Sequence, residues 1–179
     1  DIAIDPIRNQ ALLLVGILSS AVNDTRIVTV DLSTGARSLL SGATTPNTDN
    51  ALGSLFDGVS MQFDDIGYRL LVFQEDVLLA VDPLTGQRTI FSPEGIVSPI
   101  DASADIRNNR VLVLNRYNSN INAVDLNSGT IDHLWDIPDT NPRRISLDAD
   151  NNRTLMLYSP NNRTIFAIDM STGRISVAY

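Results

Sequence analysis

The sequence predicts an all-β protein built from four repeated units, each with four antiparallel strands. Two observations support this. A five-residue string, Asp-x-x-(Thr/Ser)-Gly, returns four times, beginning at Asp31, Asp82, Asp125 and Asp169. Short runs rich in Ile, Val, Leu and Thr alternate with clusters of Asp, Asn and Gly, which is typical of strands separated by turns. No segment keeps an apolar period of 3.6 residues long enough for an α-helix.

The repeated string recurs at intervals of 51, 43 and 44 residues, and periods of this length indicate a repeat architecture. A second marker, a polar turn that leads into a strand, precedes each string. Its copies are DPIRNQALLLV, DDIGYRLLVF, DIRNNRVLVL and DADNNRTLML, which begin at Asp5, Asp64, Asp105 and Asp148. Each unit is therefore predicted to run strand, turn, strand, loop, strand, turn, strand.

The fourth unit shows how each element is assigned. Its strands are RRISL, TLMLYS, TIFAI and RISVAY, joined by the turn DADNNR, the loop PNNR and the turn DMSTG. The same assignment places the four units at about 1–42, 58–92, 99–137 and 142–179.

The Asp-x-x-(Thr/Ser)-Gly string has a structural explanation. A strand that reverses within four residues needs one position at positive φ, which Gly occupies without a Cβ clash. The Asp side chain accepts hydrogen bonds from the free N–H groups of the turn. We therefore predict that this string forms a hairpin turn and has no catalytic role.

Two segments depart from the repeat. The first unit has an enlarged loop, GILSSAVNDT, at Gly16–Thr25, and an insertion at 43–57 separates the first and second units. Long irregular loops on a rigid scaffold are often functional or disordered. These two segments are the first places to look for function.

Four-stranded units with a period in the forties are typical of β-propeller blades. The pattern Pro-x-x-(apolar)-x-x-Asp, strand, Asn-Asn-Arg, strand, Asp-x-x-Thr-Gly resembles NHL and YVTN-type propeller repeats and the related gluconolactonase and regucalcin-like propellers. The best matches are Pro142 to Asp148 with Asn162 and Arg163, and Pro99 to Asp105. The resemblance covers almost the whole chain. It implies a β-propeller of four four-stranded antiparallel blades and names no activity.

The predicted order of strands bears on ring closure. The chain starts at an inner strand and finishes at an outer one, so neither terminus completes the blade of the other. An open arc of four blades would expose faces rich in Ile, Leu and Val. We expect these units to be part of a larger ring or to pair with another copy.

Composition excludes several classes of function. The net charge is −8, from 19 Asp, 2 Glu and 13 Arg with no Lys, so we expect no nucleic-acid binding. The absence of Cys excludes disulfides, zinc–thiolate sites and a cysteine nucleophile. The longest apolar stretch, Ala11 to Leu18, is too short to span a bilayer, and we expect no membrane insertion.

Catalytic motifs are also missing from the sequence. There is no G-x-S-x-G elbow, and the one histidine, His133, falls on a predicted outer strand. Asp148, Asp150 and Asn152 have the spacing that opens a calcium loop, but Arg153 stands where that loop needs Gly. We predict a turn there and no cofactor, with calcium as the alternative.

A column of polar residues lies four positions before each first-turn Asp: Asp1, Ser60, Asp101 and Arg144. The propeller resemblance implies that this column lies near the mouth of the central channel, where gluconolactonase-like propellers hold a metal. Asp1, Ser60 and Asp101 are therefore candidate metal ligands. The alternative is that these residues line the channel and are held by water or by each other.

The loops expected on one face supply the candidate ligand-binding residues. They are Glu75, Glu94, Arg116, Tyr117, Asn161 and Arg163. Arg and Tyr are enriched at interfaces, which favours protein or glycan contact. The two glutamates are also a candidate carboxylate pair for glycoside hydrolysis. Asn23, Asn152 and Asn162 lie in N-x-(Ser/Thr) sequons.

Two hypotheses follow from the sequence. The first is a non-enzymatic propeller module, extracellular or periplasmic, that binds a protein or glycan through its loop face. The second is a metal-dependent hydrolase of the lactonase type that uses the channel-mouth column. The irregular loops on a regular scaffold, without a catalytic constellation, favour the first.

Overall fold

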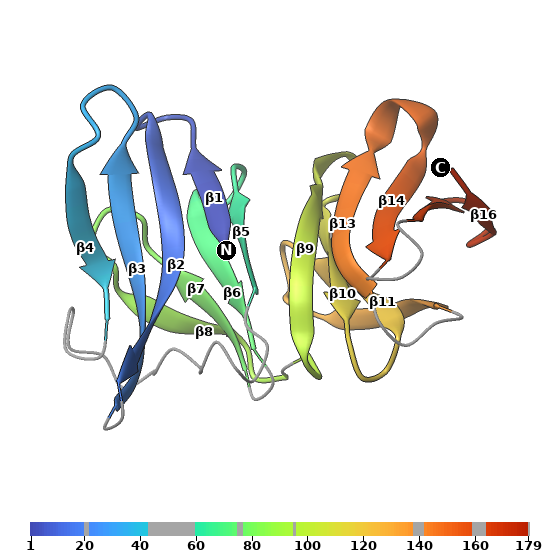
Figure 1. Cartoon of the computed structure of the whole chain (residues 1–179), viewed down its shortest axis with the longest axis horizontal. Helices are drawn as coiled ribbons and strands as arrows, with labels where there is room; N and C mark the ends of the chain where they lie inside the picture. Colours follow the sequence, from blue (N-terminus) through green and yellow to red (C-terminus); the bar gives the residue numbers. More distant parts are fainter. Residues whose placement is uncertain are drawn as a thin grey trace. The chain divides into compact units, whose positions relative to one another are not determined.

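The structure is a computed structural model that describes residues 1–19, 22–42, 60–74, 77–94, 96–137, 142–158 and 164–178. These residues form two compact units, Asp1–Ile96 and Val97–Tyr179. Each unit contains two four-stranded antiparallel sheets, whose strands follow chain order across the sheet (Figure 1). The prediction of an all-β chain with four such sheets is confirmed.

The first unit contains strands β1 to β8. The first sheet has β1 (Ile2–Asp5), β2 (Gln10–Ser19), β3 (Val22–Asp31) and β4 (Arg37–Ser41). The second has β5 (Ser60–Asp64), β6 (Arg69–Phe73), β7 (Leu78–Val81) and β8 (Arg88–Ser92).

The second unit contains strands β9 to β16. One sheet has β9 (Pro99–Asp105), β10 (Arg110–Asn115), β11 (Asn120–Asp125) and β12 (Ile131–Asp136). The other has β13 (Pro142–Asp148), β14 (Arg153–Tyr158), β15 (Ile165–Asp169) and β16 (Ile175–Val177). Two short 3-10 turns, η2 (Ile106–Asn108) and η3 (Ala149–Asn151), follow β9 and β13. No helix among the described residues has the length and hydropathy of a membrane span.

Buried and exposed side chains alternate along the strands, and the buried side chains form the core of each unit. In β1 the side chains of Ala3 and Asp5 are buried, whereas Ile2 and Ile4 are exposed, because successive strand residues point to opposite faces. Both sheets of the first unit contribute to its core: Ala3, Leu12, Leu14, Ile27, Leu40, Met61, Phe63, Leu70, Val72, Leu79 and Val81. The core of the second unit is formed in the same way: Leu112, Leu114, Ile121, Ala123, Ile137, Ile145, Met156 and Ile168.

The repeated hairpin turn has the structure that its sequence predicts. The carboxylate of Asp31 accepts hydrogen bonds from the N–H groups of Ser33 and Thr34 at 2.9 and 2.7 Å. Gly35 has a φ of 72° and donates its N–H to the carbonyl of Asp31 at 2.8 Å. The three later copies place their glycines at φ values of 70–73°.

The first turn of each sheet contains a second left-handed position, which was not predicted from the sequence. In the second sheet Tyr68 lies there, with a φ of 47°. In the other three sheets the residues are Asn9, Asn109 and Asn152, with φ values of 50–53°, and Asn tolerates this region better than most residues. Their carbonyl groups accept hydrogen bonds from Leu32, Leu126 and Met170 in the repeated hairpin turn, at 2.9–3.0 Å. The two turns at that end of a blade are therefore tied together.

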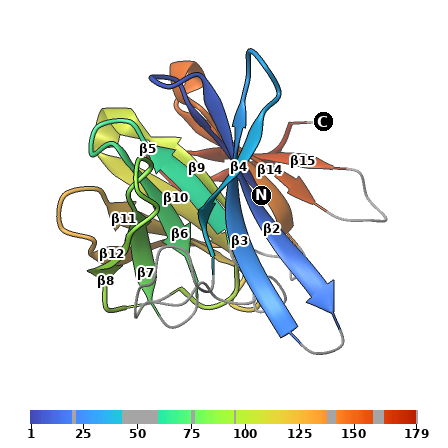
Figure 2. The ribbon, with the colours of Figure 1, turned by 90° about the vertical axis from the view of Figure 1, so that its left-hand side faces the viewer.

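One sequence expectation about a loop is wrong. The segment Gly16–Thr25 was expected to be an irregular loop, but β2 continues to Ser19 and β3 starts at Val22. Gly16 pairs with Thr25, and Leu18 with Asn23, in one ladder. Figure 2 shows this hairpin extending beyond the rest of its sheet. The insertion at 43–57 lies outside the described residues.

Candidate functional site

The candidate site lies where the second strand of a blade turns into the third. In the second unit this end contains the start of β9, the β10–β11 turn, the end of β12 and the start of β13, and we call it the loop face. Hydrogen bonds hold these segments together. Arg116 donates its N–H to the carbonyl of Ser98 at 3.1 Å, and Ile137 donates to the carbonyl of Ser119 at 2.6 Å.

Arg116 and Tyr117 are the predicted ligand-binding residues that the structure brings together. They begin the β10–β11 turn, which Ser119 closes by donating its N–H to the carbonyl of Arg116 at 3.4 Å. The side chain of Tyr117 is 74% exposed. A short, hydrogen-bonded turn therefore presents the aromatic ring of Tyr117 to solvent, next in sequence to the partly buried Arg116.

The β10–β11 hairpin also has unsatisfied polar atoms. Three buried side-chain atoms of the described residues have no hydrogen-bond partner: Asn115 Oδ1, Arg116 Nε and Asn122 Oδ1. The amide of Asn115 donates to Asn120 Oδ1 at 2.5 Å, so only its oxygen is unpaired. Buried polar atoms without partners cost free energy. All three of these atoms lie on one hairpin, β10–β11.

Of the other predicted ligand-binding residues, the structure describes only Glu94, which belongs to the first unit. Glu94 follows β8, is exposed, and donates its N–H to Ser92 Oγ at 3.3 Å. Glu75, Asn161 and Arg163 lie outside the described residues. The separation of the two glutamates, and with it their use as a carboxylate pair, is therefore not tested.

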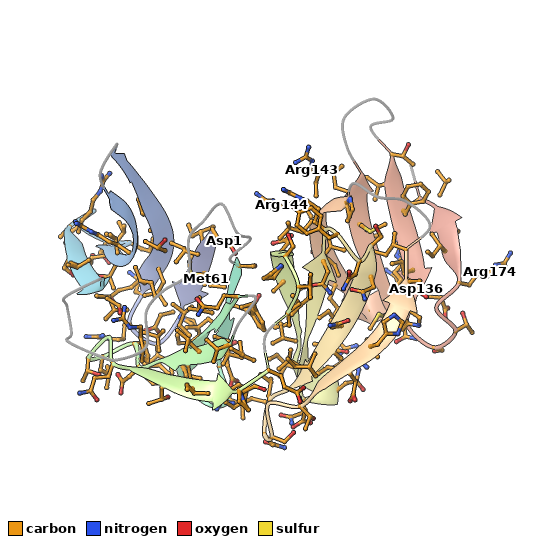
Figure 3. All side chains as sticks on the ribbon, turned by 90° about the horizontal axis from the view of Figure 1, so that it is seen from below. Asp1, Met61, Asp136, Arg143, Arg144 and Arg174 are labelled. Carbon is orange, nitrogen blue, oxygen red and sulfur yellow. The ribbon has the colours of Figure 1, made fainter. Side chains whose placement is uncertain are left out.

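The column of candidate metal ligands connects neighbouring sheets in the described residues. Asp1 Oδ2 accepts hydrogen bonds from Ser60 Oγ and from the N–H of Met61, both at 2.9 Å. Figure 3 shows Asp1 and Met61 beside each other. In the second unit Asp101 Oδ2 accepts the N–H of Ile145 at 2.7 Å. Each carboxylate therefore caps an N–H group at the open edge of the next inner strand.

The fourth member of the column, Arg144, is exposed at the start of β13, beside Arg143 (Figure 3). Its guanidinium donates to the carbonyl groups of Ile100 and Arg143 at 3.4 and 3.3 Å. Burial raises the pKa of Asp101, while the N–H of Ile145 and the charge of Arg144 act in the opposite direction. Within the described ranges, no group of three His, Cys, Asp or Glu residues is arranged to hold a metal ion.

The structure also shows where His133 and the calcium-like stretch from Asp148 lie. His133 lies on β12, an edge strand, and contacts the carboxylate of Asp136 at 2.9 Å. The calcium-like stretch from Asp148 forms the 3-10 turn η3, and Asp148 accepts hydrogen bonds from Asn151 and Arg153. The Arg153 guanidinium is the main cause of the lowered pKa of Asp148.

The contacts that join neighbouring blades are not among the predictions made from the sequence. Besides the aspartates of the column, Ser103 Oγ accepts the N–H of Leu147 at 3.0 Å. Arg107 donates to the carbonyl of Ala149 and to Asp150 Oδ1, both at 2.9 Å. The sequence does contain a signal for these contacts, which is a polar side chain at every second position of an inner strand. Two acids in one column were instead interpreted as candidate metal ligands.

No protein-family model matches the chain, and no curated protein matches it. Solved structures do match. A chain of a nidogen–laminin complex is 12% identical, with a TM-score of 0.71 over 97% of this chain and 60% of that one. TolB from Acinetobacter baumannii is 17% identical, with a TM-score of 0.64 over 98% of this chain and 42% of that one.

A third match is an auxiliary nutrient binding protein from Bacteroides ovatus, which is 11% identical with a TM-score of 0.69. The match covers 99% of this chain and 41% of that one. The chain thus spans 41–60% of the length of these three structures. At such low identity the likeness concerns the fold alone. Together with the four four-stranded sheets, it shows that the chain has the β-propeller fold.

Proposed function

We propose that the chain is a non-enzymatic binding module that takes a protein or glycan ligand on its loop face. The observation that carries this proposal is the β10–β11 turn, which presents Tyr117 at 74% exposure next to Arg116. Tyr supplies a rigid, amphipathic contact surface at low entropic cost, and Arg supplies several donors. Both residues are enriched where proteins bind their ligands.

The unpaired atoms of the same hairpin support this position for the site. Asn115 and Asn122 each keep an amide oxygen without a donor, and Arg116 keeps Nε without an acceptor. A ligand that carries both donors and acceptors, such as a peptide backbone or a sugar, has the matching chemistry. Because these three atoms are buried, a ligand can form hydrogen bonds with them only if it displaces the groups that now cover them.

The similar structures support binding as the class of function. One belongs to a nidogen–laminin complex and another is a nutrient binding protein. Those descriptions concern those proteins, and here they motivate the proposal only.

The repeat pattern favours the NHL and YVTN-type group within the fold. We also propose an extracellular or periplasmic location, which cell fractionation tests.

The experiment is a screen of protein and glycan arrays with the purified chain. The test variant replaces Arg116 and Tyr117 with Ala, together with Arg163 from the predicted neighbouring loop. The control variant is Arg174→Ala with Ile7→Ala, because both residues are exposed and neither belongs to a segment of the loop face. We expect the test variant to lose at least about tenfold in affinity, as hot-spot residues do. Unchanged binding by the test variant would place the site elsewhere.

A further inference from the structure

A pocket of about 390 Å³ lies between the two sheets of the second unit, at the end of the blades opposite the loop face. Residues of η2 and η3 form its sides, and Leu147 and Met170 add apolar surface. Asp105 also lines the pocket, although its side chain is only 3% exposed. A volume of this size is within the usual range for sites that bind small molecules.

The junction between these two sheets has an equivalent in the first unit. Asp101 accepts the N–H of Ile145 in the second unit, and Asp1 accepts the N–H of Met61 in the first. Both aspartates lie four residues before the Asp of their polar turn. The two junctions can therefore be compared position by position.

At the junction of the first unit, a tyrosine reaches from one blade to the other. Tyr68 packs against the core, and its ring meets the ring of Phe63 edge-on, with 5.7 Å between the ring centroids. Its hydroxyl donates to Asp5 Oδ2 at 3.1 Å, and Asp5 is 1% exposed. A buried carboxylate of the first blade thus receives a phenol from the second.

The second unit keeps the carboxylate but lacks the phenol. Asp105 is the repeat equivalent of Asp5, whereas Asn152 and Leu147 stand in place of the tyrosine and the phenylalanine. Both replacements are smaller, and both line the pocket. The amide of Asn152 donates to Ser171 Oγ at 2.8 Å, so it does not reach the carboxylate.

We propose that this pocket binds the phenol group of a ligand, with the ring against Leu147 and Met170 and the hydroxyl donating to Asp105. Thioether sulfur makes favourable contacts with aromatic rings. A phenol combines an apolar ring with one hydroxyl donor. The pocket lies at the other end of the blades, so this inference does not depend on the loop-face function proposed above.

The buried carboxylate has room for one more donor. Within the described part of the chain, Asp105 accepts two hydrogen bonds from the amide of Asn108, one on each oxygen, and one on Oδ2 from Arg110. An ionised carboxylate has about four acceptor positions. A ligand hydroxyl can therefore add to Oδ1 without breaking these bonds.

The charges of the pocket favour an uncharged ligand. Asp105 is paired with Arg110 at 2.8 Å, and Asp150 is paired with Arg107 at 2.9 Å. Each carboxylate is thus already balanced by a guanidinium, which leaves no excess charge to attract a cation or an anion. A phenol is uncharged at neutral pH.

The ion pair between Arg107 and Asp150 links η2 to η3 at the pocket. The two side chains are 66% and 90% exposed, and exposed pairs of this kind contribute little to stability. Opening the pair to admit a ligand therefore costs little. The guanidinium of Arg107 can then lie over the ring of the phenol, which is a favourable cation–π arrangement.

Ligand-observed NMR with p-cresol and the whole chain tests the proposal. We expect saturable binding with a Kd of about 1 mM, which is usual for so small a ligand. Toluene, which lacks the hydroxyl, should bind at least about tenfold more weakly, because it offers no donor to Asp105. N-acetyl-L-tyrosinamide distinguishes the source of the phenol. Binding as tight as that of p-cresol indicates a tyrosine of a protein partner, and its exclusion indicates a free phenolic compound.

The variant Asn152→Tyr fills the pocket from within the chain. Asn152 has a φ of 50°, close to the 47° of Tyr68, so the backbone already has the conformation from which a tyrosine reaches the carboxylate. We expect this variant to bind p-cresol at least about tenfold more weakly. Asn127→Tyr is the matched control, because Asn127 is exposed in the β11–β12 turn and does not line the pocket. Circular dichroism establishes that both variants are folded.

The converse variant, Tyr68→Asn, removes the phenol from the first unit. It should gain a second binding site, so p-cresol should raise its melting temperature more than that of the unmodified chain. The decision rests on Asn152→Tyr, which changes an exposed residue. No saturable binding of p-cresol, equal binding of toluene, or unchanged binding by Asn152→Tyr would overturn the proposal.

Discussion

The carboxylate of Asp101 on β9 accepts a 2.7 Å hydrogen bond from the backbone N–H of Ile145 on β13. Asp1, which directly precedes β1, makes the equivalent bond to Met61 on β5 at 2.9 Å. Inner strands are the edges of their sheets, and an edge presents N–H groups that lack a ladder partner. A carboxylate from the preceding blade satisfies one of these groups and joins the two sheets.

This contact predicts a stability effect. Asp101→Ala should lower the free energy of unfolding by about 1–3 kcal/mol, because a buried N–H loses its acceptor. Asp101→Asn should lower it less, since the amide oxygen still accepts. Chemical denaturation with urea measures both. Asp132→Ala, which changes an exposed aspartate on β12, is the matched control, and equal losses for Asp101→Ala and the control would contradict the assignment.

The glycines of the repeated turn predict unequal effects of the same substitution. Gly35 and Gly173 have φ values of 72° and 70°, so Ala at either position costs about 1–2 kcal/mol of backbone strain. A Cβ at Gly35 would have no atom within 4 Å, whereas a Cβ at Gly173 would overlap the indole of Trp135. Displacing that ring costs about 1–3 kcal/mol more.

Thermal unfolding of Gly35→Ala and Gly173→Ala measures the difference, with Gly35→Ala as the control for backbone strain. Trp135 is the one tryptophan of the chain, so its fluorescence should shift in Gly173→Ala and stay constant in Gly35→Ala. Indistinguishable melting temperatures for the two variants would show that Trp135 does not pack on this turn.

The hairpin turns predict a pH dependence. The N–H of Thr34, followed by its hydroxyl, lowers the pKa of Asp31 below its ordinary value of 3.8. Groups of the residue three positions on likewise lower the pKa values of Asp125 and Asp169. A lowered pKa in the folded state contributes stability above the unfolded value, and this stability is lost as the pH falls through the folded value.

The free energy of unfolding should therefore decrease as the pH falls below about 4, and the triple variant Asp31→Asn, Asp125→Asn, Asp169→Asn should show a shallower decrease. Asp101 has the opposite sign, because burial raises its pKa and favours the protonated form. Its contribution is removed when the series is measured in an Asp101→Asn background. Urea titrations at several pH values test this, and an unchanged slope in the triple variant would refute it.

The hydrogen bonds of Asp1 and Asp101 predict that the column of Asp1, Ser60 and Asp101 does not bind metal ions specifically. Asp1 and Asp101 already use carboxylate oxygens for bonds to the next blade. We expect isothermal calorimetry with calcium and zinc to give no saturable heat, and thermal unfolding to be unaffected. Saturable binding that Asp101→Asn abolishes would support the metal-dependent hydrolase instead.

Local chemistry explains how much of the fold could be predicted. The turn at Asp31 to Gly35 is determined by residues within one short string, since Asp accepts nearby N–H groups and Gly takes positive φ. The segment Gly16–Thr25 has the composition of a loop, because Ser, Asn and Asp favour loops. A two-stranded ladder needs backbone pairing rather than apolar side chains, and strand preference depends on context.

The candidate site could be predicted only in part, because it depends on contacts between residues that are far apart in the sequence. The sequence placed Arg116 and Tyr117 in a loop, and the structure shows the turn that presents them. It placed Asp1 and Asp101 in one column without revealing their partners. Those partners, Met61 and Ile145, lie 60 and 44 residues further along the chain.

The sequence by itself determined the repeated turns, the four four-stranded units and all of their strands except the extension of β2 and β3, because these depend on side chains within a few residues of one another. The tertiary structure alone decided which carboxylates join neighbouring blades, which hairpin keeps unpaired polar atoms and where a pocket lies between two blades. The physical reason is that hydrogen bonding and burial are settled between segments, and the local pattern of one strand does not specify what the adjacent sheet brings to it.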